Sequence, residues 1–267
     1  MEQRVTVSVD AGAVRRMAAT LDRPVAPASG EPLPLLWHWL LLLPDERTNQ
    51  LDVDGHPHTA QWLPEIDLPR RMWAGSRVRC SAPLRVGDTV ERCSTVHSVQ
   101  HKEGRSGRLA FVTLRHTYLA EGREALVEEQ DLVYREPTAA NAPVQDPRRP
   151  EWAAQFSRTV QPHAALLFRY SALTFNAHRI HYDRDYAMEQ EGYPGLVVQG
   201  PLTATLLAGL FEEAQPQARV ATLSFRAEAP LFDTAPFSLH GRRIGTKTQL
   251  WAQAPVGGIA MSMEIET

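Results

Sequence analysis

The chain of 267 residues is 43% hydrophobic and 22% charged, a balance typical of a soluble protein with one large domain or two ordinary ones. Its formal net charge of -3 argues against a nucleic-acid partner, because phosphate binding favours a basic surplus. The most apolar run, residues 33–44, is too short to span a bilayer, and the first residues lack a signal-peptide pattern. With only Cys80 and Cys93 and no CxxC pair, the sequence predicts a cytoplasmic protein without a zinc motif.

The first half of the chain predicts two helices, a loop and a group of strands. We expect a short helix near residues 11–21 and a buried helix over residues 35–43, which are apolar on nearly every side. Residues 44–71 are rich in Pro, Asp, Asn and Gly and predict a long irregular loop, a kind of segment that is often functional. Segments with the composition of antiparallel strands follow at regular spacing: residues 76–84, 86–99, 109–120 and 125–136.

The second half repeats this order after residues 137–150, which hold four prolines and have the composition of a linker. A helix is expected from Pro201 to about Ala214. Strands are then expected over residues 219–229, 237–244, 248–254 and 258–265. The stretch Arg79–Leu84 of the first half is also echoed by Arg226–Leu231 in the second, which indicates a duplication.

These patterns predict an α+β fold made of two similar units. Residues 1–136 form the first unit, residues 137–150 the linker, and residues 151–267 the second unit. Each unit is expected to be a long helix wrapped by an antiparallel sheet.

One turn-rich segment gathers most of the polar chemistry. Between Tyr170 and Leu207 the chain carries a cluster of polar side chains followed by a glycine-led apolar helix. The cluster consists of Asn176, His178, His181, Tyr182 and Asp183. Because backbone N–H groups at the start of a helix stabilise negative charge on a ligand, the segment predicts the active site of an enzyme.

The segment from Tyr170 to Ala187 resembles the signature of the MaoC-like (R)-specific enoyl-CoA hydratases, which have the hotdog fold of a helix wrapped by a curled sheet. That signature is an aromatic residue, a small residue, Gly-Asp-x-Asn-Pro, an aliphatic residue, His, five residues, and Ala or Ser. Here Asn176 stands at the catalytic aspartate, His178 at the asparagine and His181 at the catalytic histidine. An amide is not a base, so the resemblance leaves one catalytic group without a counterpart.

The form FNAHRIHYD is similar to that of a double-hotdog branch of this family. The branch contains the type 2 3-hydroxyacyl-thioester dehydratases and the hydratases of 3-methylfumaryl-CoA (mesaconyl-C4-CoA) and itaconyl-CoA. The first half resembles the same branch in PLPLLWHWLLLLP, DGHP, LPRRMWAGSRV, PLRVGD, GRSG and VEEQDLVYRE. The resemblance implies a double hotdog in which residues 1–136 shape the substrate tunnel or lid without taking part in catalysis, while residues 151–267 carry the motif.

Hydration of an enoyl thioester needs a water activated over Cβ and a proton delivered to Cα. His181 is expected to act as general base and acid, because a near-neutral pKa serves both directions. Asn176 is expected to hold the water through its amide oxygen, and His178 to support the site. Asp183 is a candidate to orient the His181 imidazole or to replace the missing carboxylate, although it also fits an exposed turn.

Substrate binding is expected around the start of the second long helix. The Gly200 N–H, next to Gln199, is predicted to stabilise the thioester enolate, and Gly195 to provide a tight turn near the thioester. Arg179 is a candidate for a substrate carboxylate or a CoA phosphate. Arg70 and Arg71 are candidates for the same role.

The resemblance thus implies a homodimeric hydro-lyase that hydrates an enoyl-CoA or dehydrates a 3-hydroxyacyl-CoA, with a branched C5 dicarboxylic acyl group as the best match. No metal or redox cofactor is expected. Three alternatives remain: a dehydratase acting on acyl-carrier-protein thioesters, a hotdog thioesterase, and a hotdog that binds acyl-CoA without catalysis. The histidines outside the motif are predicted to be structural: His38, His97, His116 and His240.

Overall fold

The computed structural model describes residues 2–57, 62–68, 70–104, 107–136 and 148–267. The strands of the first half are β1 (Glu2–Ser8), β2 (Arg70–Cys80), β3 (Thr89–Gly104), β4 (Gly107–Ala120) and β5 (Arg123–Arg135). Those of the second half are β6 (Phe156–Val160), β7 (Thr222–Ala227), β8 (Phe237–Ile244), β9 (Lys247–Gln253) and β10 (Ile259–Glu266). The α-helices are α1 (Ala11–Thr20), α2 (Ala164–Leu173) and α3 (Gly200–Ala214). Short turns of other helix types are η1 (Trp37–Leu41), η2 (Thr48–Gln50), η3 (Arg179–His181) and η4 (Tyr186–Gln190).

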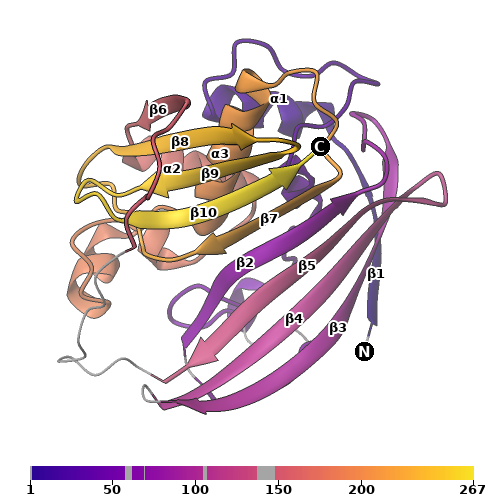
Figure 1. Ribbon diagram of the computed structural model, residues 1–267. Coiled ribbons are helices and arrows are strands. Elements are labelled where there is room, and N and C mark those ends of the chain that lie inside the picture. The colour runs from indigo at the N-terminus through magenta and orange to yellow at the C-terminus, as the bar shows by residue number, and fades with distance from the viewer. Residues whose placement is uncertain (1, 58–61, 69, 105–106, 137–147) are drawn as a thin grey trace.

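All ten strands belong to one antiparallel sheet, in the order β1-β3-β4-β5-β2-β7-β10-β9-β8-β6. The two halves meet where β2 pairs with β7, from Gly75 opposite Arg226 to Arg79 opposite Thr222. A side chain at Gly75 would place its Cβ 2.2 Å from the Phe225 carbonyl oxygen, so this junction requires glycine. In Figure 1 the sheet curls, and helices α2 and α3 lie behind the strands of the second half.

The predicted duplication is visible in the backbone after β2 and β7. The carbonyl of Ala125 accepts the N–H groups of both Ser81 and Ala82, at 2.9 and 3.0 Å. At the corresponding place in the second half, the carbonyl of Ala260 accepts those of Glu228–Ala229, at 2.8 and 3.1 Å. The short sequence echo therefore marks one turn that is built twice.

The second half has the predicted long central helix. Helix α3 is buried at every position from Leu202 to Phe211, and Pro201 occupies its first turn, where a missing N–H is not a loss. Helix α2, which the sequence pattern did not predict, precedes it. The Gln199 side chain joins the two, because its Nε2 donates to the Leu167 carbonyl at 2.8 Å and to Ser171 Oγ at 2.9 Å.

The first half differs from the prediction of a long buried helix over residues 35–43. These residues form only the five-residue 3₁₀ turn η1, which is fully buried. Leu36 before it adopts a left-handed conformation with φ of 66°, which an α-helix does not permit. The prediction of burial was correct and the prediction of a long helix was wrong. An apolar run has no polar face, so its sequence does not show the helical period.

The loop after η1 occupies the inner face of the first half of the sheet. Trp62, Leu63, Ile66 and Leu68 pack against a buried cluster on β4 and β5. That cluster consists of Ala110, Val112, Leu114, Leu132 and Tyr134. The loop therefore supplies apolar cover that a longer helix provides in the second half.

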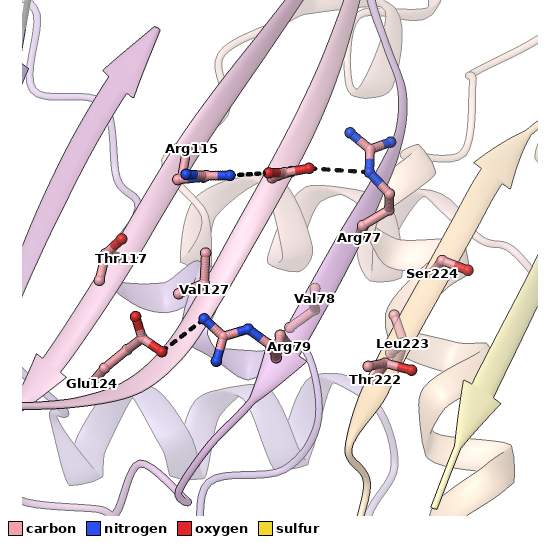
Figure 2. A pocket seen from close by; sticks show the side chains of 11 residues that line it. Arg77, Val78, Arg79, Arg115, Thr117, Glu124, Val127, Thr222, Leu223 and Ser224 are labelled. Atoms are coloured by element: carbon pink, nitrogen blue, oxygen red, sulfur yellow. Dashed lines mark hydrogen bonds and ion pairs between the residues drawn. The ribbon is translucent and has the colours of Figure 1, made fainter. Parts of the chain in front are cut away.

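The outer face of the sheet carries a shallow hollow across the junction of the two halves (Figure 2). Its volume is about 500 Å³, and ion pairs cross its floor: Arg115 with Glu129, Arg77 with Glu129, and Arg79 with Glu124. Because all three arginines already face carboxylates, this hollow offers no free cation for an anionic ligand, and no residue of the His181 segment lines it.

Most of the linker, residues 137–147, lies outside the described part of the chain, so the domain boundary stays a prediction. In the described residues no helix has the length and apolar character needed to cross a bilayer.

Candidate active site

The polar segment begins with a sharp change of direction after α2. Thr174 Oγ1 donates to the Tyr170 carbonyl at 2.8 Å, and Phe175 adopts a left-handed conformation with φ of 50°. The Asn176 Oδ1 then accepts the backbone N–H of His178 at 3.0 Å, an Asx turn that leads directly into η3. The predicted water-holding oxygen of Asn176 therefore already has one protein donor, and its clearest role is to shape the turn.

His181 lies at the end of η3 and is 8% exposed. Its Nδ1 is 2.8 Å from the Val197 carbonyl, which can only accept, so Nδ1 carries the proton and Nε2 presents a lone pair. Burial lowers the pKa of His181 to about 4, although the Val197 hydrogen bond partly opposes this shift. The side chain is therefore neutral near pH 7 and available as a base.

This lowered pKa predicts the acid limb of the pH–rate profile. Since the neutral imidazole is the reactive form, protonation of His181 should lower kcat/KM only below about pH 5, towards the His181 pKa of about 4. The measurement is kcat/KM for enoyl-CoA hydration across pH 4 to 8, with the fold checked by circular dichroism at each pH. An acid limb centred near the ordinary histidine value of about 6.5 would contradict a buried His181 base.

Gly200 is the first residue of α3, and its surroundings fit the predicted oxyanion role. A Cβ built on Gly200 meets no atom within 4 Å, so space lies open beside its backbone. The first N–H groups of a helix have no acceptor within the helix and lie at its positive end. Gln199, also predicted to bind substrate, ties α3 to α2 through its Nε2; its Oε1 is buried without a partner among the described residues, so the predicted role stays a prediction.

Three other predicted site residues serve the framework. Asp183 pairs with Arg179 at 2.8 Å and accepts the Tyr186 N–H at 3.1 Å, so it neither orients His181 nor replaces the missing carboxylate. The Arg179 guanidinium also donates to the Val53 carbonyl at 3.1 Å, and it is not a free cation for a substrate anion. A Cβ on Gly195 would lie 2.6 Å from Asp233 Oδ1, so this glycine permits a close protein contact, and its predicted place near the thioester stays a prediction.

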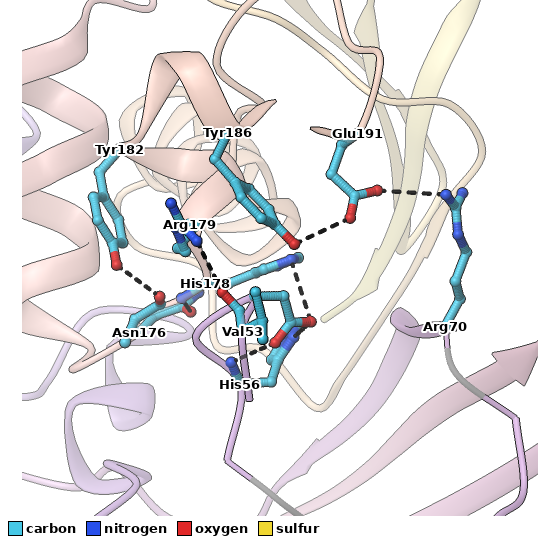
Figure 3. Close-up of polar contacts among 11 residues, drawn as sticks. Val53, His56, Arg70, Asn176, His178, Arg179, Tyr182, Tyr186 and Glu191 are labelled. Carbon is cyan, nitrogen blue, oxygen red and sulfur yellow. Dashed lines mark hydrogen bonds and ion pairs between the residues drawn. The ribbon is translucent and has the colours of Figure 1, made fainter. Parts of the chain in front are cut away.

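The structure brings a carboxylate from the first half of the chain to the site, which the sequence analysis did not predict. Asp54 and His56, from the loop of residues 44–68, lie against His178 (Figure 3). Asp54 Oδ2 is 2.9 Å from His56 Nδ1 and 3.9 Å from His178 Nε2. The motif DGHP was the available signal, but no local pattern indicates which distant segment it contacts.

His178 connects this pair to His181. Its ring centroid is 3.9 Å from that of His56 and 5.3 Å from that of His181. Burial lowers the pKa of His178 strongly, and the neighbouring His56, His181 and Arg71 add to this shift, while Asp54 opposes it. His178 is thus a neutral imidazole between two others. One ligand atom from each of Asp54, His56 and His178 lies within 4.8 Å of the others, which is close enough to hold a metal ion.

Comparison with known proteins identifies the family of this chain. A family model described as hydroxyacyl-thioester dehydratase type 2 matches residues 36–233. The chain belongs to the hydroxyacyl-thioester dehydratase type 2 family. It is therefore a hydro-lyase that acts by hydration or dehydration of acyl thioesters, and the predicted enzyme class is confirmed.

One relative of this dehydratase, the mesaconyl-C(4)-CoA hydratase of Chloroflexus aurantiacus, is 49% identical over 253 residues, covering 93% of this chain and 89% of that protein. Among solved structures, a MaoC-like dehydratase of Phytophthora capsici is 13% identical, with a TM-score of 0.74 and coverage of 100% and 95%. A protein of Mycobacterium tuberculosis described as a double hotdog is 14% identical, with a TM-score of 0.52 and coverage of 98% and 94%. The double hotdog fold is thereby confirmed for this family member.

Proposed function

We propose that this enzyme adds water to a branched C5 dicarboxylic enoyl-CoA, with mesaconyl-C4-CoA (3-methylfumaryl-CoA) as the first candidate and itaconyl-CoA as the second. The observation that carries the proposal is the 49% identity to a mesaconyl-C(4)-CoA hydratase over nearly the whole chain. The site supplies what the reaction needs: a neutral base at His181 and a helix N-terminus at Gly200.

In this mechanism His181 Nε2 removes a proton from water while the water oxygen bonds to Cβ. The electrons of the double bond move towards the thioester, whose oxygen becomes negative. The Gly200 N–H, at the positive end of α3, stabilises that charge, an interaction of about 3 kcal/mol in other oxyanion sites. Protonation of Cα completes the addition and gives the 3-hydroxyacyl-CoA.

Arg71 supports a substrate with a free carboxylate. It lies close enough to His178 for its charge to contribute to the lowered pKa of that residue, after burial and the nearby histidines. Among the described residues no acid forms an ion pair with Arg71, whereas Arg70 pairs with Glu191 at 3.5 Å. An arginine beside the reacting groups matches the distal carboxylate of a C5 dicarboxylic acyl group.

The test of the proposed substrate is a comparison of kcat/KM for mesaconyl-C4-CoA, itaconyl-CoA and crotonyl-CoA, followed by loss of the enoyl-thioester absorbance. The proposal expects a dicarboxylic substrate to exceed crotonyl-CoA by at least about tenfold, as one charge-assisted contact of about 1.5 kcal/mol provides. A preference for crotonyl-CoA, or for an acyl-carrier-protein thioester, would reject the dicarboxylic assignment while leaving the hydro-lyase class intact.

Replacement of Arg71 gives a sharper prediction about the same contact. Arg71→Ala should raise KM for mesaconyl-C4-CoA by about 10-fold to 100-fold, because a charge-assisted hydrogen bond contributes about 1.5–3 kcal/mol. The KM for crotonyl-CoA, which lacks the carboxylate, should stay within about threefold. Arg77→Ala is the matched control, since Arg77 lies on the same strand and pairs with Asp131 on the outer face. An equal rise in KM for both substrates would show that Arg71 does not bind the carboxylate.

A cytoplasmic location and a homodimer are further parts of this proposal. They follow from the composition of the chain and from the family resemblance. Size-exclusion chromatography with light scattering is the measurement that decides the oligomeric state.

A further inference from the structure

The turn from Asp52 to His56 is held firmly against the catalytic segment, although it belongs to the other half of the chain. The Arg179 N–H donates to the Asp54 carbonyl at 2.8 Å, across the boundary between the halves. Gly55 has φ of 88°, and a Cβ there would lie 1.9 Å from the Ala177 carbonyl oxygen. Only glycine permits this approach, so the turn is built to touch the residues just before His178.

Within this turn Asp54 fixes the orientation of His56. Its Oδ1 accepts the backbone N–H of His56 at 2.8 Å, and its Oδ2 lies 2.9 Å from His56 Nδ1. Burial opposes ionisation of Asp54, but the hydrogen bonds and the charge of His56 outweigh it and lower the Asp54 pKa. An ionised carboxylate can only accept, so Asp54 places a proton on His56 Nδ1.

His56 and His181, which lie on either side of His178, are each held through Nδ1. His181 is held at Nδ1 by the Val197 carbonyl and His56 at Nδ1 by the Asp54 carboxylate, so each has its Nε2 available. Their acceptors differ in charge. The acceptor of His181 is a neutral carbonyl in a deeply buried place, whereas the acceptor of His56 is an ionised carboxylate. Such a difference between neighbouring groups separates a general base from a general acid.

We propose that His56, oriented by Asp54, is the second acid–base group of the hydration site. It takes the place of the catalytic aspartate of the family, where this chain has Asn176. The inference rests on the proposed hydratase function. His181 takes a proton from water as the C–O bond forms at Cβ, and the electrons of the double bond pass into the thioester enolate. The charged His56 gives its Nε2 proton to Cα, which restores the thioester carbonyl. The net change is the addition of one water, and the two imidazoles exchange their protons with solvent between turnovers.

This role makes the first half a catalytic partner, in contrast to the lid or tunnel function that the family resemblance implied for residues 1–136. His56 is the catalytic residue, while Asp54 is a positioning residue that acts through it. Asp183, the carboxylate that follows His181 most closely in sequence, is already paired with Arg179 and has no part in the step.

The test compares His56→Ala, His56→Gln and Asp54→Asn with wild type and with the control His97→Ala, whose side chain is 43% exposed on β3. Wild type is assayed first, with the hydrated product identified by mass spectrometry. Each His56 variant should lose at least about 100-fold in kcat with a smaller change in KM, and added imidazole should restore part of the His56→Ala rate. Asp54→Asn should lower kcat less than the His56 variants do and leave KM nearly unchanged, because Asp54 acts by orienting His56.

The possible outcomes separate this inference from the proposed function. Inactive wild type would overturn both, whereas an active wild type with folded His56 variants within about threefold of its kcat would overturn only the role of His56. Loss of activity on chelation, with stoichiometric metal in the purified protein, would also overturn it, since the three side chains would then be metal ligands. Imidazole rescue of His56→Ala, together with a loss in kcat and not in KM for Asp54→Asn, supports it, because added imidazole does not repair a merely structural defect. Melting temperatures of all variants show which of them remain folded.

Discussion

Replacing His181 by alanine is expected to reduce kcat for enoyl-CoA hydration by about 100-fold to 10,000-fold, the range that a general acid–base group contributes. The hydrogen bond to Val197 occupies Nδ1, so Nε2 is the ring nitrogen that can act on the substrate. Acyl-CoA binding should change far less than kcat, because the interaction matters in the transition state. The measurement is kcat and KM of the variant beside a dissociation constant for the acyl-CoA.

Two controls separate chemistry from folding in this experiment. His181→Gln retains a polar side chain in the buried position and should be as inactive as the alanine variant. His240→Ala removes a histidine that stacks on Trp251 in β8 and β9 and should retain the wild-type rate. If a folded His181→Ala protein keeps kcat within about threefold of wild type, another residue of the site is the general base.

Replacing Glu128 by alanine is expected to destabilise the protein by about 3–5 kcal/mol, because two buried side chains lose their acceptor at about 1–3 kcal/mol each. Glu128 on β5 is fully buried. It lies 2.9 Å from His38 Nε2 and accepts the Trp39 Nε1–H at 3.0 Å. Without Glu128, both groups of η1 lose their acceptor inside the core, and η1 loses its anchor to the sheet. Urea denaturation, followed by fluorescence, measures the change.

The neighbouring residue is the natural control for this second prediction. Glu129 points to the outer face, where it pairs with Arg77 and Arg115, and Glu129→Ala should cost no more than about 1 kcal/mol. Glu128→Gln retains an oxygen acceptor at nearly the same volume and should fall between the two alanine variants. Equal stability of Glu128→Ala and Glu129→Ala would mean that the buried pair contributes no more than a surface one.

The strands were predictable from their β-forming composition and from the turns between them. Which side chains face inward was less clear: in β5, residues 128–131 are all polar, yet Glu128 and Gln130 face inward and Glu129 and Asp131 outward. Helix α3 was clear, since an apolar stretch opened by Gly200 and Pro201 has both length and a start signal. The run over residues 35–43 lacks a polar face, and only the structure shows that it turns as a 3₁₀ helix.

The candidate site was predictable to the extent that its chemistry is local. His181 and the Gly200 N–H are recognisable from motif spacing and from the start of a helix. Asp54 and His56 are not, because their position depends on a loop that crosses to the other half and on Gly55 fitting against Ala177. Asp183 shows the converse: a carboxylate two residues from His181 in sequence turns away to pair with Arg179.

The central claim is that this chain adds water to the double bond of an enoyl-CoA at His181. The most direct test incubates the purified protein with mesaconyl-C4-CoA or crotonyl-CoA in water enriched in heavy oxygen and determines the masses of the products. Hydration predicts an intact CoA thioester that is heavier by one labelled water, formed by wild type and not by His181→Ala. Release of free CoA with the label in a carboxylic acid would identify a thioesterase instead and would contradict the account.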